Sequence, residues 1–162
     1  RQGFLQVVNV ADHLAHQLGL KEAASGEATV VAFLWPCHKR KLAYSLARAD
    51  AREAGLRLRL LLEALHAASS AEVIVIGHSM GCRVALHALA GAHEAPSEAP
   101  PLCARVVLLG AAVDATCLAA GGEFERAHLR VSGQVVAMFS SHDETLSRHF
   151  WIGEAMSGGG LW

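Results

Sequence analysis

One stretch of the sequence, from Val73 to Leu89, limits the possible fold more than any other. It opens with four β-branched apolar residues, Val73-Ile74-Val75-Ile76, which suit a central strand buried on both faces of a parallel sheet. The short sequence Gly77-His78-Ser79-Met80-Gly81 follows, and the apolar positions that run on to Leu89 predict an amphipathic helix. We therefore expect a strand, a sharp turn and a helix, with glycine where side chains at Gly77 and Gly81 would crowd the turn.

The turn contains the motif G-x-S-x-G. Between a strand and a helix this motif is typical of a nucleophile elbow, in which the turn lifts a serine hydroxyl above the carboxyl edge of the sheet. Ser79 is thus the candidate nucleophile, and the backbone N–H of Met80, at the helix N-terminus, is a candidate oxyanion donor. The alternative role for Ser79 is that of a helix N-cap. Dinucleotide or nucleotide binding is disfavoured, since G-x-G-x-x-G is missing and no Walker lysine follows Gly81.

The rest of the chain alternates between strand-like and helix-like patterns. Strands are predicted at residues 28–34, 105–110 and 134–139, helices at 4–18, 42–67, 123–129 and 145–156, and a loop at 91–101. This alternation predicts βαβ units, and hence an α/β three-layer sandwich whose mostly parallel sheet has helices on both faces. Ligands of such sheets gather beyond the carboxyl ends of the strands, where we expect Ser79, Asp114 and Asp143.

Composition narrows the class of protein and of partner. A chain of 162 residues fits a single domain over 1–162, and its net charge of −1 gives no reason to expect nucleic acid or an anionic membrane as partner. No apolar run reaches the roughly 18 residues that cross a bilayer, so a soluble protein is expected, with the cytoplasm favoured. The scattered cysteines Cys37, Cys82, Cys103 and Cys117 are expected to serve as small buried hydrophobes, and no metal site is predicted.

Several short motifs together resemble a family of proteins. They are GHSMG after a strand, FLWP at the end of the preceding strand, Val113-Asp114, and Ser141-His142-Asp143 followed by Leu146-Ser147. In this combination the chain is similar to an esterase-like family of α/β hydrolases over nearly its whole length. The family pattern implies an HG-type oxyanion loop before the first helix and a histidine after one further strand beyond the acid. Since the chain shows neither, we expect a partial hydrolase domain that lacks its first strands and its last one.

The acid of the expected triad has two candidates. Asp143 is favoured because the usual chain order in this fold is serine, acid, histidine, with the acid after a strand later than the elbow strand. Its alternative role is to cap the helix predicted from Thr145. Asp114 is the reserve acid, although capping of the segment that begins at Ala115 is the role we favour for it.

No histidine of the chain holds the family's usual place for the base. His149 lies about two turns beyond His142 and can act as the base only if the C-terminal segment folds back. His78 is expected to project away from the nucleophile, to pack or to line the substrate site, and His87 is expected to be a surface or half-buried helix residue. Arg83 and the basic loop at 39–41 are expected to be solvated charge.

These residues predict a serine hydrolase of the esterase or lipase type. It would form an acyl-enzyme intermediate on a small-molecule ester or other acyl substrate, with no cofactor, by a Ser-His-Asp triad. The competing hypothesis is a non-catalytic hydrolase-like binding module or an inactive truncated fragment. Because a missing triad member costs a large part of the rate, the chain by itself is expected to be weakly active or inactive. Substrate identity and oligomeric state cannot be read from these patterns.

Overall fold

The computed structural model describes residues 29–36, 44–91, 99–140 and 142. The chain divides into two compact units, Arg1–Trp35 and Pro36–Trp162. In the first unit, residues 29–35 form no regular secondary structure, so the strand predicted at 28–34 is wrong over the residues described. A run of β-branched residues suits a strand, but a strand exists only when its backbone groups pair with those of a neighbour. Neither ladder found in the described sheet includes this segment.

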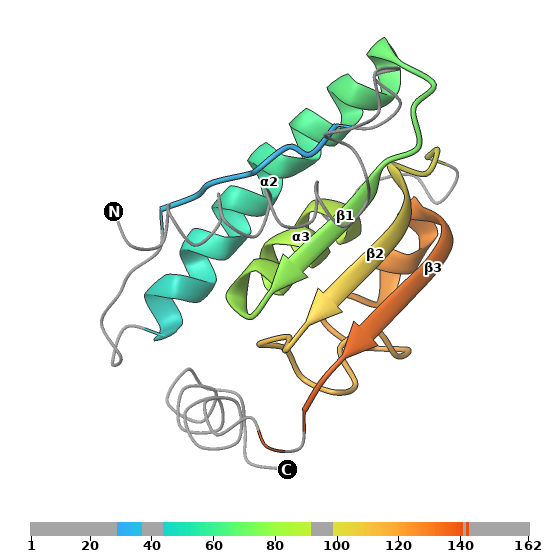
Figure 1. Ribbon diagram of the computed structural model, residues 1–162. Coiled ribbons are helices and arrows are strands. Elements are labelled where there is room, and N and C mark those ends of the chain that lie inside the picture. The colour runs from blue at the N-terminus through green and yellow to red at the C-terminus, as the bar shows by residue number, and fades with distance from the viewer. Residues whose placement is uncertain (1–28, 37–43, 92–98, 141, 143–162) are drawn as a thin grey trace. The chain divides into compact units, whose positions relative to one another are not determined.

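The second unit contains a parallel sheet with helices (Figure 1). In chain order its elements are α2 (Tyr44–Ala68), β1 (Ile74–His78), α3 (Met80–Ala90), β2 (Cys103–Leu109), the 3-10 helix η1 (Glu125–Arg130) and β3 (Val131–Met138). The strands lie in the order β1-β2-β3, and both pairs are parallel. The predicted α/β class with a parallel sheet is therefore confirmed.

The strand register aligns the carboxyl ends of all three strands. His78, the last residue of β1, pairs with Leu109 of β2, and Leu109 pairs with Met138 of β3. A register shift between Cys103 and Arg105 lies at the amino end of β2, away from this edge. Because Ser79 directly follows β1, the turn that carries it stands at the edge where the ends of β2 and β3 also lie.

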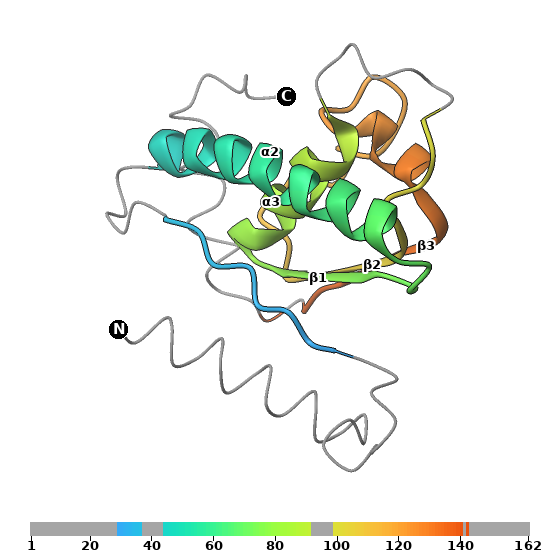
Figure 2. The same ribbon diagram turned by 90° about the horizontal axis from the view of Figure 1, so that it is seen from above.

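Helices α2 and α3 pack together over one face of the sheet (Figure 2). Most of α3 is buried, whereas α2 buries one helical stripe of small and apolar residues, namely Ala47, Ala51, Ala54, Leu58 and Leu62. Gly55 lies beside this stripe, where an added Cβ would stand 2.5 Å from the Cβ of His87. The small residues of α2 thus allow its backbone to come close to α3 and hold the elbow helix against the sheet.

The opposite face of the sheet carries apolar side chains that remain exposed among the described residues, including Ile74, Ile76, Val136 and Met138. The helices predicted at 4–18 and 145–156 lie outside the described residues. Within the described part of the chain, no helix has both the length and the apolar character needed to span a bilayer.

The segment between β2 and β3 contains a short helix. A helix was expected at 123–129, and the chain forms the short 3-10 helix η1 at Glu125–Arg130, with turns on either side of Gly121. The backbone bonds of this region join residues three apart, as in Gly122 N–H to the Ala119 carbonyl and Ala127 N–H to the Phe124 carbonyl. Glycines at positions 121 and 122 disfavour a longer regular helix, because glycine loses the most backbone freedom on ordering.

Candidate active site

The backbone of Ser79 adopts a conformation that few residues with a side chain tolerate. Its φ of 52° and ψ of −121° make it the one non-glycine residue with positive φ in the described part of the chain. Such a conformation costs on the order of 1–3 kcal/mol and persists only where the surroundings impose it. Although Ser79 occupies the N-cap position of α3, its hydroxyl makes no capping hydrogen bond. The N-cap alternative is therefore wrong, and the hydroxyl is not committed to the helix.

Backbone groups from the neighbouring strand hold this turn on both sides. The Ser79 N–H donates to the Leu109 carbonyl at 2.9 Å, and the Ser79 carbonyl accepts from the N–H of Ala112 at 3.2 Å. The same carbonyl accepts from the N–H of Cys82, at 3.1 Å, in the first turn of α3. The end of β2 and the loop after it therefore clamp Ser79 from outside its own strand and helix.

The two glycines of the motif play different roles. A Cβ at Gly77 would lie 2.9 Å from the Cα of Cys82 and 3.0 Å from the Gly81 carbonyl oxygen, and neither backbone atom can move without opening the turn. A Cβ at Gly81 would meet no atom within 4 Å. The expected crowding is thus confirmed at Gly77 and wrong at Gly81, whose Cβ position is open.

Comparison with known protein families identifies the family to which the chain belongs. Residues 5–151 match the model of a family described as alpha/beta hydrolase of unknown function, DUF900. The chain belongs to this family. No curated protein and no solved structure matches the chain at a significant level. Membership of the DUF900 family establishes the α/β-hydrolase fold. The chemistry of the site depends on its own residues and not on the fold.

Within this DUF900 chain, the residues on either side of Ser79 belong to the strand and the helix that the turn joins. Met80 is the first residue of α3, so its N–H is among those that have no acceptor within the helix. The side chain of His78, at the end of β1, is exposed. The turn therefore places a serine hydroxyl and a backbone N–H at adjacent positions of a helix N-terminus, where the helix dipole favours negative charge.

Of the two candidate acids, Asp114 lies among the described residues. Asp114 lies in the exposed loop after β2, and its carboxylate accepts hydrogen bonds from both the N–H and the hydroxyl of Thr116. The hydroxyl of Thr116, and then its backbone N–H, lower the pKa of Asp114. This turn matches the capping role that the sequence favoured for Asp114. Asp143 and the candidate base His149 lie outside the described residues, and His142 is exposed.

A buried charge cluster beside the elbow was not predicted. Arg83, expected as solvated charge, has a side chain only 1% exposed and donates from Nη1 to Glu123 at 2.6 Å and from Nε to the Ala112 carbonyl at 3.3 Å. Its guanidinium carbon lies 5.6 Å from the ring centre of Phe124. Arg48 of α2 also reaches Glu123, at 3.5 Å. The sequence signal for this cluster was the presence of Arg83 and His87 in the mostly apolar run of α3.

His87 is half-buried against the same cluster, as its position on the helix suggested. Its ring lies edge-on to Phe124, with the ring centres 4.8 Å apart. Burial lowers the pKa of His87 from its ordinary value of 6.5 to about 4, with further lowering from Arg83, Arg52 and Arg48 and an opposing effect of Glu123. At neutral pH the ring is uncharged, so its 4.0 Å approach to Glu123 is not an ion pair.

The cysteines that the structure describes behave as buried apolar residues, as predicted. Cys82, Cys103 and Cys117 are free and buried, and burial raises the pKa of the thiols of Cys82 and Cys103 to about 11. The Cys82 thiol donates to the Leu109 carbonyl at 3.6 Å, the same oxygen that accepts from Ser79. Among the residues described, no group of three His, Cys, Asp or Glu side chains could hold a metal ion.

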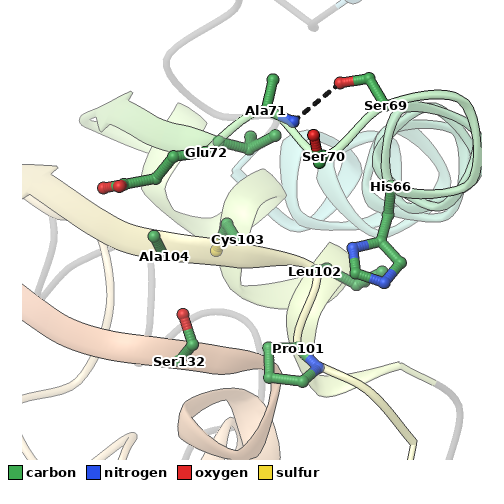
Figure 3. Close-up of a pocket in the computed structure, with 11 residues that line it drawn as sticks. His66, Ser69, Ser70, Ala71, Glu72, Pro101, Leu102, Cys103, Ala104 and Ser132 are labelled. Carbon is green, nitrogen blue, oxygen red and sulfur yellow. Dashed lines mark hydrogen bonds between the residues drawn. The ribbon is translucent and has the colours of Figure 1, made fainter.

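A hollow of about 620 Å³ lies at the amino edge of the sheet (Figure 3), whereas Ser79 follows the carboxyl end of β1. It is formed by the end of α2 and the amino ends of the strands, with His66, Glu72, Cys103 and Ser132 among its residues. The hydrogen bond drawn within it joins the N–H of Ala71 to the Ser69 hydroxyl at 2.9 Å, in the turn after α2. Ligands of parallel sheets bind at the carboxyl edge, so this hollow is not the candidate site.

The difference between the two motif glycines gives a matched stability test. We expect Gly77→Ala to lower the free energy of unfolding by about 1–3 kcal/mol, because its Cβ meets backbone atoms that cannot move away. Gly81→Ala should change it by less than about 1 kcal/mol, because its Cβ has open space and alanine favours a helix. Urea denaturation of both variants measures the two effects. Equal losses would show that the close contact at Gly77 does not hold the turn.

The pKa of His87 predicts how stability changes in weak acid. Between pH 6.5 and about 4 His87 binds a proton in the unfolded chain but not in the folded protein. The free energy of unfolding should therefore decrease as the pH is lowered through this range. His87→Gln should lose less stability than the wild type between pH 7 and pH 4.5, as measured by urea denaturation at each pH. Parallel losses in the two proteins would contradict the lowered pKa.

Proposed function

We propose that this protein is a serine hydrolase that cleaves a small-molecule ester or a related acyl substrate, with Ser79 as its nucleophile. The observation that carries the proposal is the strained backbone of Ser79 between β1 and α3, combined with a hydroxyl that takes no part in capping the helix. A serine that only caps a helix needs no strained backbone, and its hydroxyl accepts a hydrogen bond from the helix. The DUF900 membership and the position of Ser79 at the carboxyl edge of a parallel sheet support the same function.

The chemistry follows from the groups at the elbow. The Ser79 oxygen would attack the acyl carbonyl while its proton passes to a base, for which His149 is the candidate that this chain offers. The carbonyl oxygen becomes an oxyanion that the Met80 N–H, at the positive end of α3, is placed to stabilise. The base then protonates the leaving alcohol, and water releases the acid from the acyl-enzyme. In this scheme Asp143 orients the base and stabilises its charged form.

The choice of Asp143 as the acid depends partly on Asp114 having another role. The Asp114 carboxylate already accepts two hydrogen bonds from Thr116 in its own loop. A triad acid must instead accept a hydrogen bond from the base while the base faces the serine. Asp143, after β3 and later in the chain than the elbow, fits the usual order of serine, acid and histidine. We therefore assign the acid to Asp143.

Labelling with a fluorophosphonate probe tests the nucleophile. We expect the full-length protein to be modified at Ser79, because only an activated serine attacks phosphorus at a useful rate. Mass spectrometry of the labelled peptide identifies the site. Ser79→Ala should not be labelled, while Ser132→Ala, which removes an exposed serine of β3, should be labelled as the wild type is. No labelling of the wild type, or equal labelling of Ser79→Ala, would favour the non-catalytic binding module.

Two matched carboxylate variants test the acid. Asp143→Asn should lower the kcat of p-nitrophenyl ester hydrolysis by about 10⁴, the loss typical of a triad acid replaced by its amide. Asp114→Asn should leave kcat nearly unchanged, because the Asp114 carboxylate serves the turn with Thr116. His149→Ala in the same assay tests the base. A large loss in Asp114→Asn with none in Asp143→Asn would reassign the acid to Asp114.

A further inference from the structure

We propose that Arg83 and Glu123 are positioning residues of the Ser79 nucleophile, and that they act through the loop after β2. This inference rests on the proposed function, because it assigns the pair a role in the reaction of Ser79. The juxtaposition that carries it is a three-step connection, from the carboxylate of Glu123 through the guanidinium of Arg83 and the backbone of Ala112 to Ser79.

Ala112 is the link between the ion pair and the elbow. It is buried, its N–H donates to the Ser79 carbonyl at 3.2 Å, and its own carbonyl accepts from Arg83 Nε at 3.3 Å. Any shift of this residue would move the backbone oxygen of Ser79, which belongs to the peptide group that Ser79 shares with Met80. The proposed oxyanion donor is the N–H of that same peptide. The position of Ala112 thus affects both the nucleophile and the oxyanion donor.

Arg83 is suited to hold Ala112 in one place. Its planar guanidinium presents donors in a rigid fork, and two of them are used in different directions, one toward Ala112 and one toward Glu123. The side chain is 1% exposed and lies over the face of Phe124, so it cannot swing into solvent as a surface arginine does. Arg83 also stands one turn after Ser79 on α3, so the fork is anchored to the helix that the elbow begins.

Glu123 fixes the other end of the fork. Its carboxylate lies 2.6 Å from Arg83 and 3.5 Å from Arg48, so it joins α3 and α2 to the segment after β2. The neighbouring Gly122 has no room for a Cβ against the carbonyls of Thr116 and Cys117, and Phe124 N–H donates to the Cys117 carbonyl at 2.7 Å. The backbone on both sides of Glu123 is therefore held in place, and this positions the Glu123 carboxylate beside Arg83.

The energetics favour a role in geometry over one in stability. Only the guanidinium of this pair is fully buried, since Glu123 is 38% exposed, and taking a charge out of water is costly. Such a pair adds little net stability, but it imposes one arrangement of donors and acceptors that an apolar contact cannot impose. Here the hydrogen bonds lead from Arg83 through Ala112 to Ser79, the strained residue that bears the proposed nucleophile.

The test compares folded variants for the reactivity of Ser79 and for the order of the loop. In Arg83→Met the apolar stem is kept, and Glu123, which is 38% exposed, can be hydrated. We expect its kcat on p-nitrophenyl acetate and its rate of fluorophosphonate labelling to fall about 10- to 100-fold with KM nearly unchanged, because a small misplacement of reacting groups costs this much. Glu123→Gln should change the same quantities in the same direction. Arg57→Met, which removes the exposed pair with Glu53 on α2, should match the wild type.

Amide hydrogen exchange gives a readout that does not depend on catalysis. We expect the Ala112 N–H to exchange at least tenfold faster in Arg83→Met, while the Val106 N–H in the centre of β2 keeps its wild-type rate. If the wild type shows neither turnover nor labelling, the proposed function fails, and exchange still decides whether Arg83 positions the loop. Wild-type reactivity or wild-type exchange at Ala112 in a folded Arg83→Met would overturn the positioning role. If Arg83→Met does not fold, Glu123→Gln decides by the same two measurements.

Discussion

A left-handed backbone is unfavourable for any residue that has a side chain, so Ser79 can keep its φ of 52° only where neighbouring groups oppose its relaxation. In this protein the opposing groups belong to β2 and the loop after it, through the Leu109 carbonyl and the Ala112 N–H. The conformation of this turn therefore depends on tertiary contacts, even though its sequence motif is local. A turn of the same sequence without this neighbouring strand would have no partner for the Ser79 N–H.

This dependence makes the register of the sheet part of the candidate site. His78 pairs with Leu109, and a shift of one residue along β2 would remove the Leu109 carbonyl from Ser79. The register is stabilised by the buried side chains of β2, among them Val106 and Leu108, which would move to the other face of the sheet after such a shift. Packing of the core thus maintains the geometry of the turn at the end of the strand.

Polar groups inside this core are arranged about the elbow and its loop. The Leu109 carbonyl accepts hydrogen bonds from both the Ser79 N–H and the Cys82 thiol. Arg83 forms an ion pair with Glu123 and donates a hydrogen bond to the Ala112 carbonyl. Each of these donors and acceptors would be costly to bury alone, because a buried polar group without a partner loses its hydration. Satisfying them together joins helix, strand end and loop into one rigid support, which is what a site needs when reacting groups must be held within a fraction of an ångström.

The sequence by itself determined the features whose causes are local. The β-branched run before Gly77, the lack of a Cβ at Gly77 and the helical period of α2 and α3 each depend on residues a few positions apart, and the strand, turn and helices formed where they were predicted. The hydrogen bonds of Thr116 to Asp114 are equally local, and the sequence favoured a capping role for Asp114 in this segment.

Only the tertiary structure decided the features that depend on distant partners. The strand expected at 28–34 needed a ladder that the described residues do not supply, and the space beside Gly81 depends on what packs there. The burial of Arg83 depends on Glu123, which lies forty residues further along the chain. A charge enters a core only when a partner of opposite charge meets it there, and no pattern within one helix records where that partner will lie.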